Sequence, residues 1–66
     1  MNVLVNGEPR SLAEGSTLAQ ALDDLGIGHS GIAIAVNADV IPRARVAEVR
    51  LREGDALEIV KAVAGG

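Results

Sequence analysis

The residues that point most directly to chemistry are the last four of the chain, Val63-Ala64-Gly65-Gly66. They follow an expected final strand, where two glycines would fill no core and make no turn. Residues without a Cβ let a backbone pass through a narrow passage and approach reacting atoms closely. The Gly66 carboxylate could attack the α-phosphate of ATP, and a sulfur nucleophile could then displace AMP from the acyl-adenylate. A glycine pair alone is equally compatible with a frayed terminus, so the preceding elements must decide.

The other polar residues give little support for catalysis or metal binding by this chain. It has one histidine, His29, and no cysteine, so nucleophile–base pairs are few and thiolate metal sites are excluded. Asp23-Asp24 and Asp55 lack metal-ligand spacing and are typical of caps and turns. Gly26-Ile27-Gly28 follows an expected helix rather than a strand, which argues against a dinucleotide-binding loop. A chain this short also cannot easily enclose a substrate pocket, and we expect it not to be an enzyme.

Composition limits the partners and the location. The chain has 66 residues, a net charge of −3 and no aromatic residue, which excludes a basic or base-stacking nucleic-acid surface. A 48% hydrophobic content argues against disorder. The longest uncharged run, 25–38, is too short to span a bilayer, and no secretion signal is visible. We therefore expect a cytoplasmic protein that binds neither nucleic acid nor membrane and is a monomer when free.

The first half of the chain predicts a hairpin followed by a helix. Alternation predicts a strand over 1–6, and Asn6-Gly7 favours a type I′ turn into a second strand over 8–13. Pro9 cannot donate a ladder hydrogen bond, so this second strand is expected at an edge. Thr17 and Gln20 have capping-box spacing at the start of a helix of about nine residues. One helical face carries Leu18, Ala21, Leu22 and Leu25, and Gly26 is expected to end the helix.

The second half predicts a returning sheet. Three more strands are expected, at 32–36, 40–41 and 56–62. Asn37-Ala38-Asp39 and Glu53-Gly54-Asp55 are turns, and 44–52 is expected to be a short irregular crossing. This order predicts an α+β fold with one helix packed on one face of a mixed sheet. The domain is expected to span 1–62, with 63–66 as a flexible tail.

Two surfaces could dock a partner while the tail enters its active site. The strand registers place four residues together on the outer sheet face, as a flat, weakly apolar patch near the tail: Leu4, Ala33, Ala35 and Val60. Alternation also predicts an exposed edge that carries Arg43, Arg45, Arg50 and Arg52 beside Glu48 and Glu53. That edge could be a solvated surface that blocks strand pairing, or a second docking rim.

Several segments carry a family resemblance over nearly the whole chain: Val5-Asn6-Gly7, Ala35-Val36-Asn37, Val40-Ile41-Pro42-Arg43, Glu53-Gly54-Asp55 and Val63-Ala64-Gly65-Gly66. Together with the element order, they resemble the ubiquitin-like β-grasp superfamily. Within it they are most similar to the ThiS family, the sulfur carrier proteins of thiamine biosynthesis. The chain departs from that family at 44–48, where a tryptophan is common and this sequence has none.

The resemblance implies a carrier whose modified residue is Gly66. A separate ubiquitin-activating-like adenylyltransferase, which uses ATP and Mg²⁺, would adenylate its carboxylate. A sulfur donor of the cysteine desulfurase or rhodanese type would then supply the sulfur of a C-terminal thiocarboxylate. The carrier would pass this sulfur to thiazole synthase and would bind no cofactor or metal itself.

Other functions share the same tail. A carrier for molybdopterin, cysteine or tRNA thiolation would use the same chemistry, although the molybdopterin type favours a longer chain and an aromatic–Pro pair that Val63-Ala64 lacks. A ubiquitin-like protein modifier would differ in its acceptor, an amine instead of sulfur. An interaction module without tail chemistry is the remaining alternative.

Overall fold

The computed structural model describes residues 1–28 and 30–61 and has a five-stranded mixed sheet with a helix on one side. The strands are β1 (Asn2–Val5), β2 (Glu8–Ser11), β3 (Ile32–Val36), β4 (Asp39–Ile41) and β5 (Ala56–Lys61). The helix α1 spans Leu18–Asp24, and a 3₁₀ helix spans Arg43–Arg45. The strand order is β2-β1-β5-β3-β4, in which β1 and β5 run parallel and the other neighbours run antiparallel. The predicted α+β fold class and element order are confirmed.

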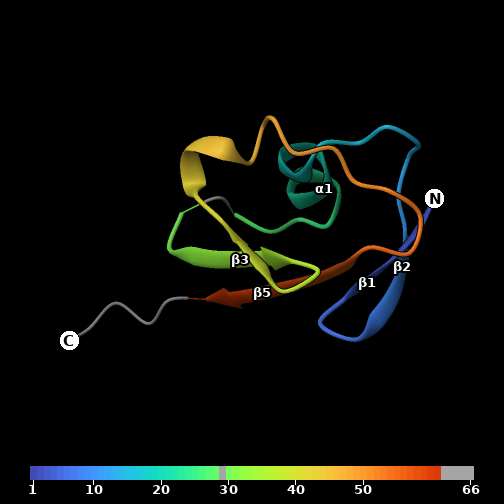
Figure 1. Cartoon of the computed structure of the whole chain (residues 1–66), viewed down its shortest axis with the longest axis horizontal. Helices are drawn as coiled ribbons and strands as arrows, with labels where there is room; N and C mark the ends of the chain where they lie inside the picture. The colour runs from blue at the N-terminus through green and yellow to red at the C-terminus, as the bar shows by residue number, and fades with distance from the viewer. Residues whose placement is uncertain (29, 62–66) are drawn as a thin grey trace.

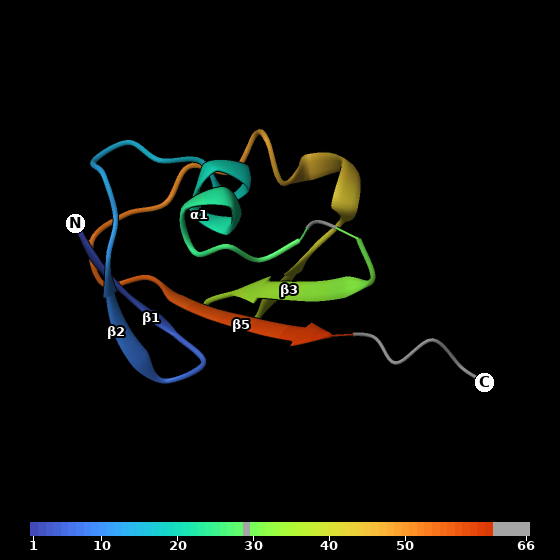
Figure 2. The ribbon, with the colours of Figure 1, turned by 180° about the vertical axis from the view of Figure 1, so that it is seen from behind.

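The two faces of the sheet differ in what covers them. Both α1 and the connection from β4 to β5 lie on the same side of the sheet (Figure 1 and Figure 2). No described residue forms a layer over the other side, which we call the outer face. The buried hydrophobic residues of the sheet, of α1 and of the connections form one core cluster: Val3, Val5, Leu12, Leu18, Ala21, Leu22, Ile34, Val36, Leu51 and Leu57.

Both hairpins turn through two residues with positive φ, as type I′ turns require. Asn6 and Gly7 have φ of 51° and 83°, which confirms the turn predicted between β1 and β2. Asn37 and Ala38 have φ of 50° and 72° between β3 and β4. The second pair is unusual because alanine rarely adopts this region. The predicted edge position of β2 is also confirmed, although both strands of the first hairpin are shorter than predicted.

The helix begins as its sequence predicts and ends slightly earlier. The Thr17 hydroxyl accepts from the Gln20 backbone N–H at 3.2 Å, and the Gln20 side chain accepts from the Thr17 N–H at 2.8 Å. This is the predicted capping box. The helix has seven residues instead of about nine, since Leu25 is its C-cap and Gly26 follows with φ of 72°.

The connection from β4 to β5 packs against the start of the helix. Its backbone carbonyls at Val46 and Val49 accept from the N–H groups of Ala19 and Leu18, which have no partner within the helix. Leu51 from the same connection is buried in the core. The predicted irregular crossing is therefore confirmed, and it both covers the core and caps α1.

Candidate functional site

The centre of the candidate site is β5, the middle strand of the sheet. It pairs with β1 on one edge and with β3 on the other, where the pairing continues to Lys61 opposite Ile32. The predicted modified residue Gly66 and the rest of the segment Val63-Ala64-Gly65-Gly66 lie outside the described residues, as do the predicted boundary at Ala62 and His29. The structure describes β5 up to Lys61, and the sequence continues from there to Gly66.

The sheet register brings the four predicted docking residues to one face. Ala33 lies directly opposite Val60 on the neighbouring strand, and Ala35 lies opposite Glu58. Leu4 shares this face through its pairing with Ala56. Leu4 is 40% exposed and Val60 is 63% exposed, large values for aliphatic side chains. The predicted register of the last strand is confirmed, because Leu57 is buried while Val60 faces solvent.

The outer face is larger than the predicted patch of four residues, and it also carries a charge. Val40 pairs with Ala35 and is 76% exposed, so it extends the apolar surface towards β4. Glu58 lies on this face between the positions of Leu4 and Val60. Both residues could have been found from the sequence, since the same period-two alternation applies to them. The whole face therefore combines exposed aliphatic groups with one central carboxylate.

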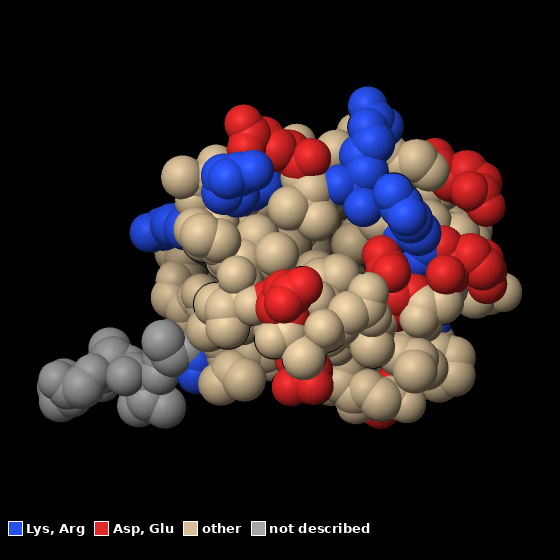
Figure 3. Space-filling model, in the orientation of Figure 1, with Lys and Arg blue, Asp and Glu red and all other residues tan. Residues whose placement is uncertain are grey.

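The prediction that four arginines lie along one exposed, alternating edge is wrong. Arg43 and Arg45 belong to a 3₁₀ helix, in which side chains do not alternate between two faces as they do in a strand. Arg45 forms an ion pair with Glu48 at 2.6 Å, and Arg50 donates to the Gly15 carbonyl at 3.0 Å. Figure 3 shows most Lys and Arg side chains of that view in its upper part, over the connecting segments rather than along the sheet. The arginines are exposed, but they do not form one sheet edge.

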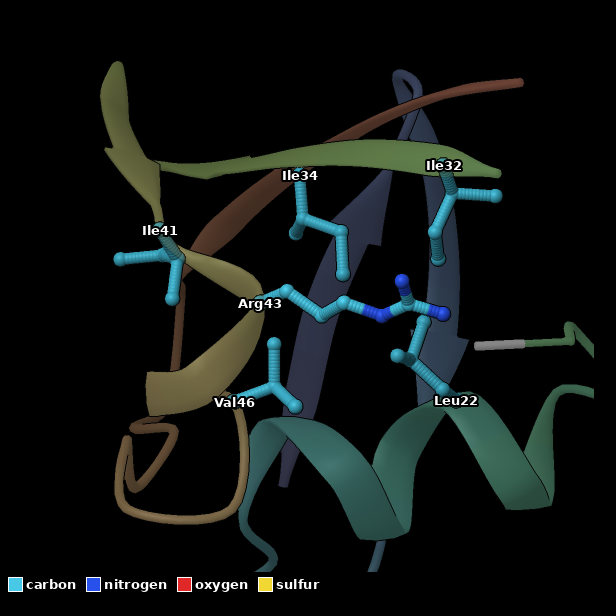
Figure 4. Close-up of a pocket in the computed structure, with 6 residues that line it drawn as sticks. All are labelled: Leu22, Ile32, Ile34, Ile41, Arg43 and Val46. Carbon is cyan, nitrogen blue, oxygen red and sulfur yellow. The ribbon is translucent and has the colours of Figure 1, made fainter. Parts of the chain in front are cut away.

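A small cavity lies between α1, β3 and the 3₁₀ helix. Its volume is about 30 Å³, and it is lined by Leu22, Ile32, Ile34, Ile41, Arg43 and Val46. Figure 4 shows the Arg43 side chain lying across it between β3 and α1. Its guanidinium donates to the Ser30 hydroxyl at 3.1 Å. A cavity of this size has room for no more than a few water molecules, so it is too small to be a substrate pocket.

The described residues offer neither a metal-binding cluster nor a transmembrane helix. Residues 1–28 and 30–61 contain no group of three or more His, Asp or Glu side chains that could hold a metal ion. Within the same ranges, no helix has the length and hydropathy needed to cross a bilayer.

Comparisons with known proteins agree with this geometry. The sequence model of the ThiS family matches residues 3–66. The sulfur carrier protein ThiS of Thermus thermophilus is 39% identical over 64 residues, which are 97% of this chain and 98% of that protein. A crystal structure of the thiamine biosynthesis protein ThiS from Geobacter metallireducens superimposes with a TM-score of 0.86 at 28% identity, over the full length of both chains.

A longer relative also contains a matching region. A thiazole synthase of Paramagnetospirillum magneticum is 33% identical over 66 residues, and this chain spans 20% of its length. The family match, the near-full-length carrier relative and the shared ubiquitin-like β-grasp fold all lead to the same assignment. The chain belongs to the ThiS family, the small sulfur carrier proteins of thiamine biosynthesis, which are carriers and not catalysts.

Proposed function

We propose that this chain carries sulfur as a thiocarboxylate on Gly66 and is recognised by its enzymes through the outer sheet face. The observation that carries the proposal is the position of β5. This central strand presents Val60 to solvent and leads directly into the C-terminal residues, so one partner surface can hold the face while its active site receives the terminus. Two glycines at the end let the backbone enter a narrow active site.

The chemistry requires three steps at the terminal carboxylate. A separate adenylyltransferase, with ATP and Mg²⁺, forms a bond between the Gly66 carboxylate and the α-phosphate and releases pyrophosphate. The terminal sulfur of a persulfide on a donor of the cysteine desulfurase or rhodanese type then displaces AMP and forms an acyl disulfide. A thiol reductant cleaves its S–S bond, so that the donor is released and the terminus becomes a thiocarboxylate. This chain contributes the acyl group and its presentation, and the enzymes contribute the catalytic groups. Because ATP supplies the energy, we place these steps in the cytoplasm.

Thiazole synthase is the acceptor that we propose for the carried sulfur. The support is the thiazole synthase that includes a region similar to this entire chain within one polypeptide. A carrier domain in the same polypeptide as its acceptor would deliver sulfur at a high effective concentration. Where carrier and acceptor are separate chains, binding through the outer face would have to bring the two together.

The composition of the outer face defines the partner surface that fits it. Its exposed aliphatic groups match an apolar partner surface, and Glu58 at its centre matches a single basic group there. The partner surface is therefore expected to be apolar with one Lys or Arg, rather than acidic.

Val60→Asp is expected to weaken binding to the adenylyltransferase at least about tenfold. An unpaired charge at the centre of a buried interface costs about 2 kcal/mol or more, and each 1.4 kcal/mol is about a factor of ten. The fold should persist because this side chain already faces solvent. Titration calorimetry measures the binding, and ATP–pyrophosphate exchange stimulated by the carrier measures the adenylation that depends on it.

Ala44→Asp is the matched control. It places the same charge at an exposed position of the 3₁₀ helix, between Arg43 and Arg45 and away from the outer face. We expect its affinity to stay within about threefold of the unmodified chain, as rim substitutions usually do. If Ala44→Asp weakens binding and Val60→Asp does not, docking uses the arginine segment and our docking face is wrong. If the unmodified chain supports no exchange, the proposed function is wrong.

A further inference from the structure

The last strand, β5, is held unequally along its two edges. On the β3 edge, the pairing covers Leu57 to Lys61 without a break. On the β1 edge, the paired residues end at Val5 and Leu57, because the chain then turns into β2. The part of β5 closest to the C-terminal residues therefore has a strand neighbour on one edge and a different support on the other.

That support is the side chain of Asn6. Its Oδ1 accepts from the Ile59 N–H at 2.8 Å, and its Nδ2 donates to the Ile59 carbonyl at 3.1 Å. Both groups of one peptide residue are thus satisfied by one carboxamide, across 53 residues of sequence. A carboxamide has the same donor and acceptor groups as a peptide unit. The Asn6 side chain therefore bonds to Ile59 as the backbone of β1 would if that strand continued.

The position of Asn6 in the ladder explains why a side chain can do this. Leu4 and Asn6 donate their backbone N–H groups to the carbonyls of Asp55 and Leu57, both at 2.9 Å, in the regular parallel pattern. The next bond of that pattern would join the Ile59 N–H to the backbone carbonyl of Asn6. The type I′ turn, with φ of 51° at Asn6, directs the backbone away, and the side-chain oxygen takes that place.

We propose that Asn6 is a positioning residue for the carrier reaction. Its two side-chain bonds to Ile59, which we call the Asn6 clamp, fix the end of β5 from which the sequence continues to Gly66. Ile59 directly precedes Val60, which we place at the docking face. The clamp therefore fixes Ile59, which lies in the sequence between the core residue Leu57 and the reacting C-terminal segment. This inference rests on the proposed function, because it concerns how the Gly66 carboxylate is presented.

The chain contains its own matched control at the opposite end of β5. Asn37 also begins a type I′ turn, with φ of 50°, and its Oδ1 accepts from the Ala56 N–H at 3.0 Å. Its Nδ2 donates to the Asp55 carboxylate at 2.9 Å. Asn37 therefore makes a similar side-chain clamp at the start of β5, the end of the strand opposite to Ile59. A general loss of stability should affect both clamps, whereas a positioning role should affect Asn6 alone.

The test compares Asn6→Gly with Asn37→Gly, because glycine keeps the positive φ of each turn and removes only the side-chain bonds. Amide hydrogen exchange should accelerate about tenfold at Ile59 in Asn6→Gly and at Ala56 in Asn37→Gly. Adenylation is then measured with both variants fully folded, as checked by circular dichroism. For Asn6→Gly we expect kcat to fall about tenfold while KM stays within about twofold, since the docking face is intact. Asn37→Gly should keep both constants.

Asn6→Asp provides a partial rescue. The carboxylate keeps the bond from the Ile59 N–H but loses the donor to its carbonyl, so exchange and kcat should lie between those of the unmodified chain and Asn6→Gly. Equal kcat losses in the two glycine variants, or an unchanged kcat in Asn6→Gly, would overturn the positioning role. An unmodified chain that is not adenylated would instead overturn the proposed function, and the exchange pattern would still report whether the clamp forms.

Discussion

Deletion of Gly66 is expected to abolish adenylation and to leave the melting curve almost unchanged. The reacting carboxylate would then belong to Gly65, one residue too short to reach the α-phosphate while the outer face is docked. A misplacement of about 1 Å can already cost on the order of a hundredfold in rate, and one residue of extended chain spans about 3.3 Å. The fold should not change, because every buried core residue named above lies between Val3 and Leu57.

Gly65→Val tests the same segment without changing its length. A branched side chain at this position would obstruct a passage shaped for bare backbone, so adenylation should again be lost. Pyrophosphate exchange and thermal denaturation followed by circular dichroism measure the two properties separately. A large loss of thermal stability on deletion of Gly66 would mean that the terminal residues are structural, contrary to the proposal.

Leu22→Ala is expected to have the opposite effect, a large loss of stability with the chemistry intact in the folded fraction. Leu22 is 1% exposed and lines the small cavity beneath Arg43, so truncation would enlarge an existing void. Such a substitution costs about 2–5 kcal/mol, a large share of the total for a domain of this size. The midpoint of thermal unfolding should fall by at least about 10 °C.

Leu4→Ala is the matched control for this prediction. It removes the same atoms from a leucine that is 40% exposed on the outer face. Because two fifths of that residue stays in water and its truncation leaves no enclosed void, its loss should cost about 1 kcal/mol, clearly less than that of Leu22. Urea denaturation of both variants gives the comparison. Equal losses at the two positions would show that the outer face is as tightly packed as the core, which is incompatible with a free docking surface.

The elements that follow from local rules were predictable from the sequence. Asn6-Gly7 has one favoured hairpin turn, and the Thr17–Gln20 pair can satisfy the exposed N–H groups of a helix start. The register of β5 followed from alternation, because Leu57 on the solvent face would have exposed a large aliphatic group. In each case, residues adjacent in sequence supply both the signal and the structure.

The features that depend on long-range contacts were not predictable in the same way. The clamp of Asn6 on Ile59 links residues 53 apart, and the turn signal at Asn6 gave no sign of it. The segment Arg43–Arg45 is a 3₁₀ helix and not the alternating edge that the sequence predicted. The Ala19 N–H, at the start of α1, donates to the Val46 carbonyl just after the 3₁₀ helix, and alternation along the sequence gives no signal for such a contact. Val40 differs from these two features, because the alternation of its own strand suffices to place it on the outer face.

The central claim is that sulfur is carried on Gly66, and mass spectrometry of the intact chain tests it most directly. The chain is incubated with the adenylyltransferase, ATP, Mg²⁺, a sulfur donor and a thiol reductant, and a reaction without ATP serves as the control. We predict a mass gain equal to the replacement of one oxygen by one sulfur, located by fragmentation in the C-terminal peptide and dependent on ATP. A gain located in an internal peptide, or an unchanged C-terminal peptide under conditions in which pyrophosphate is released, would contradict the account.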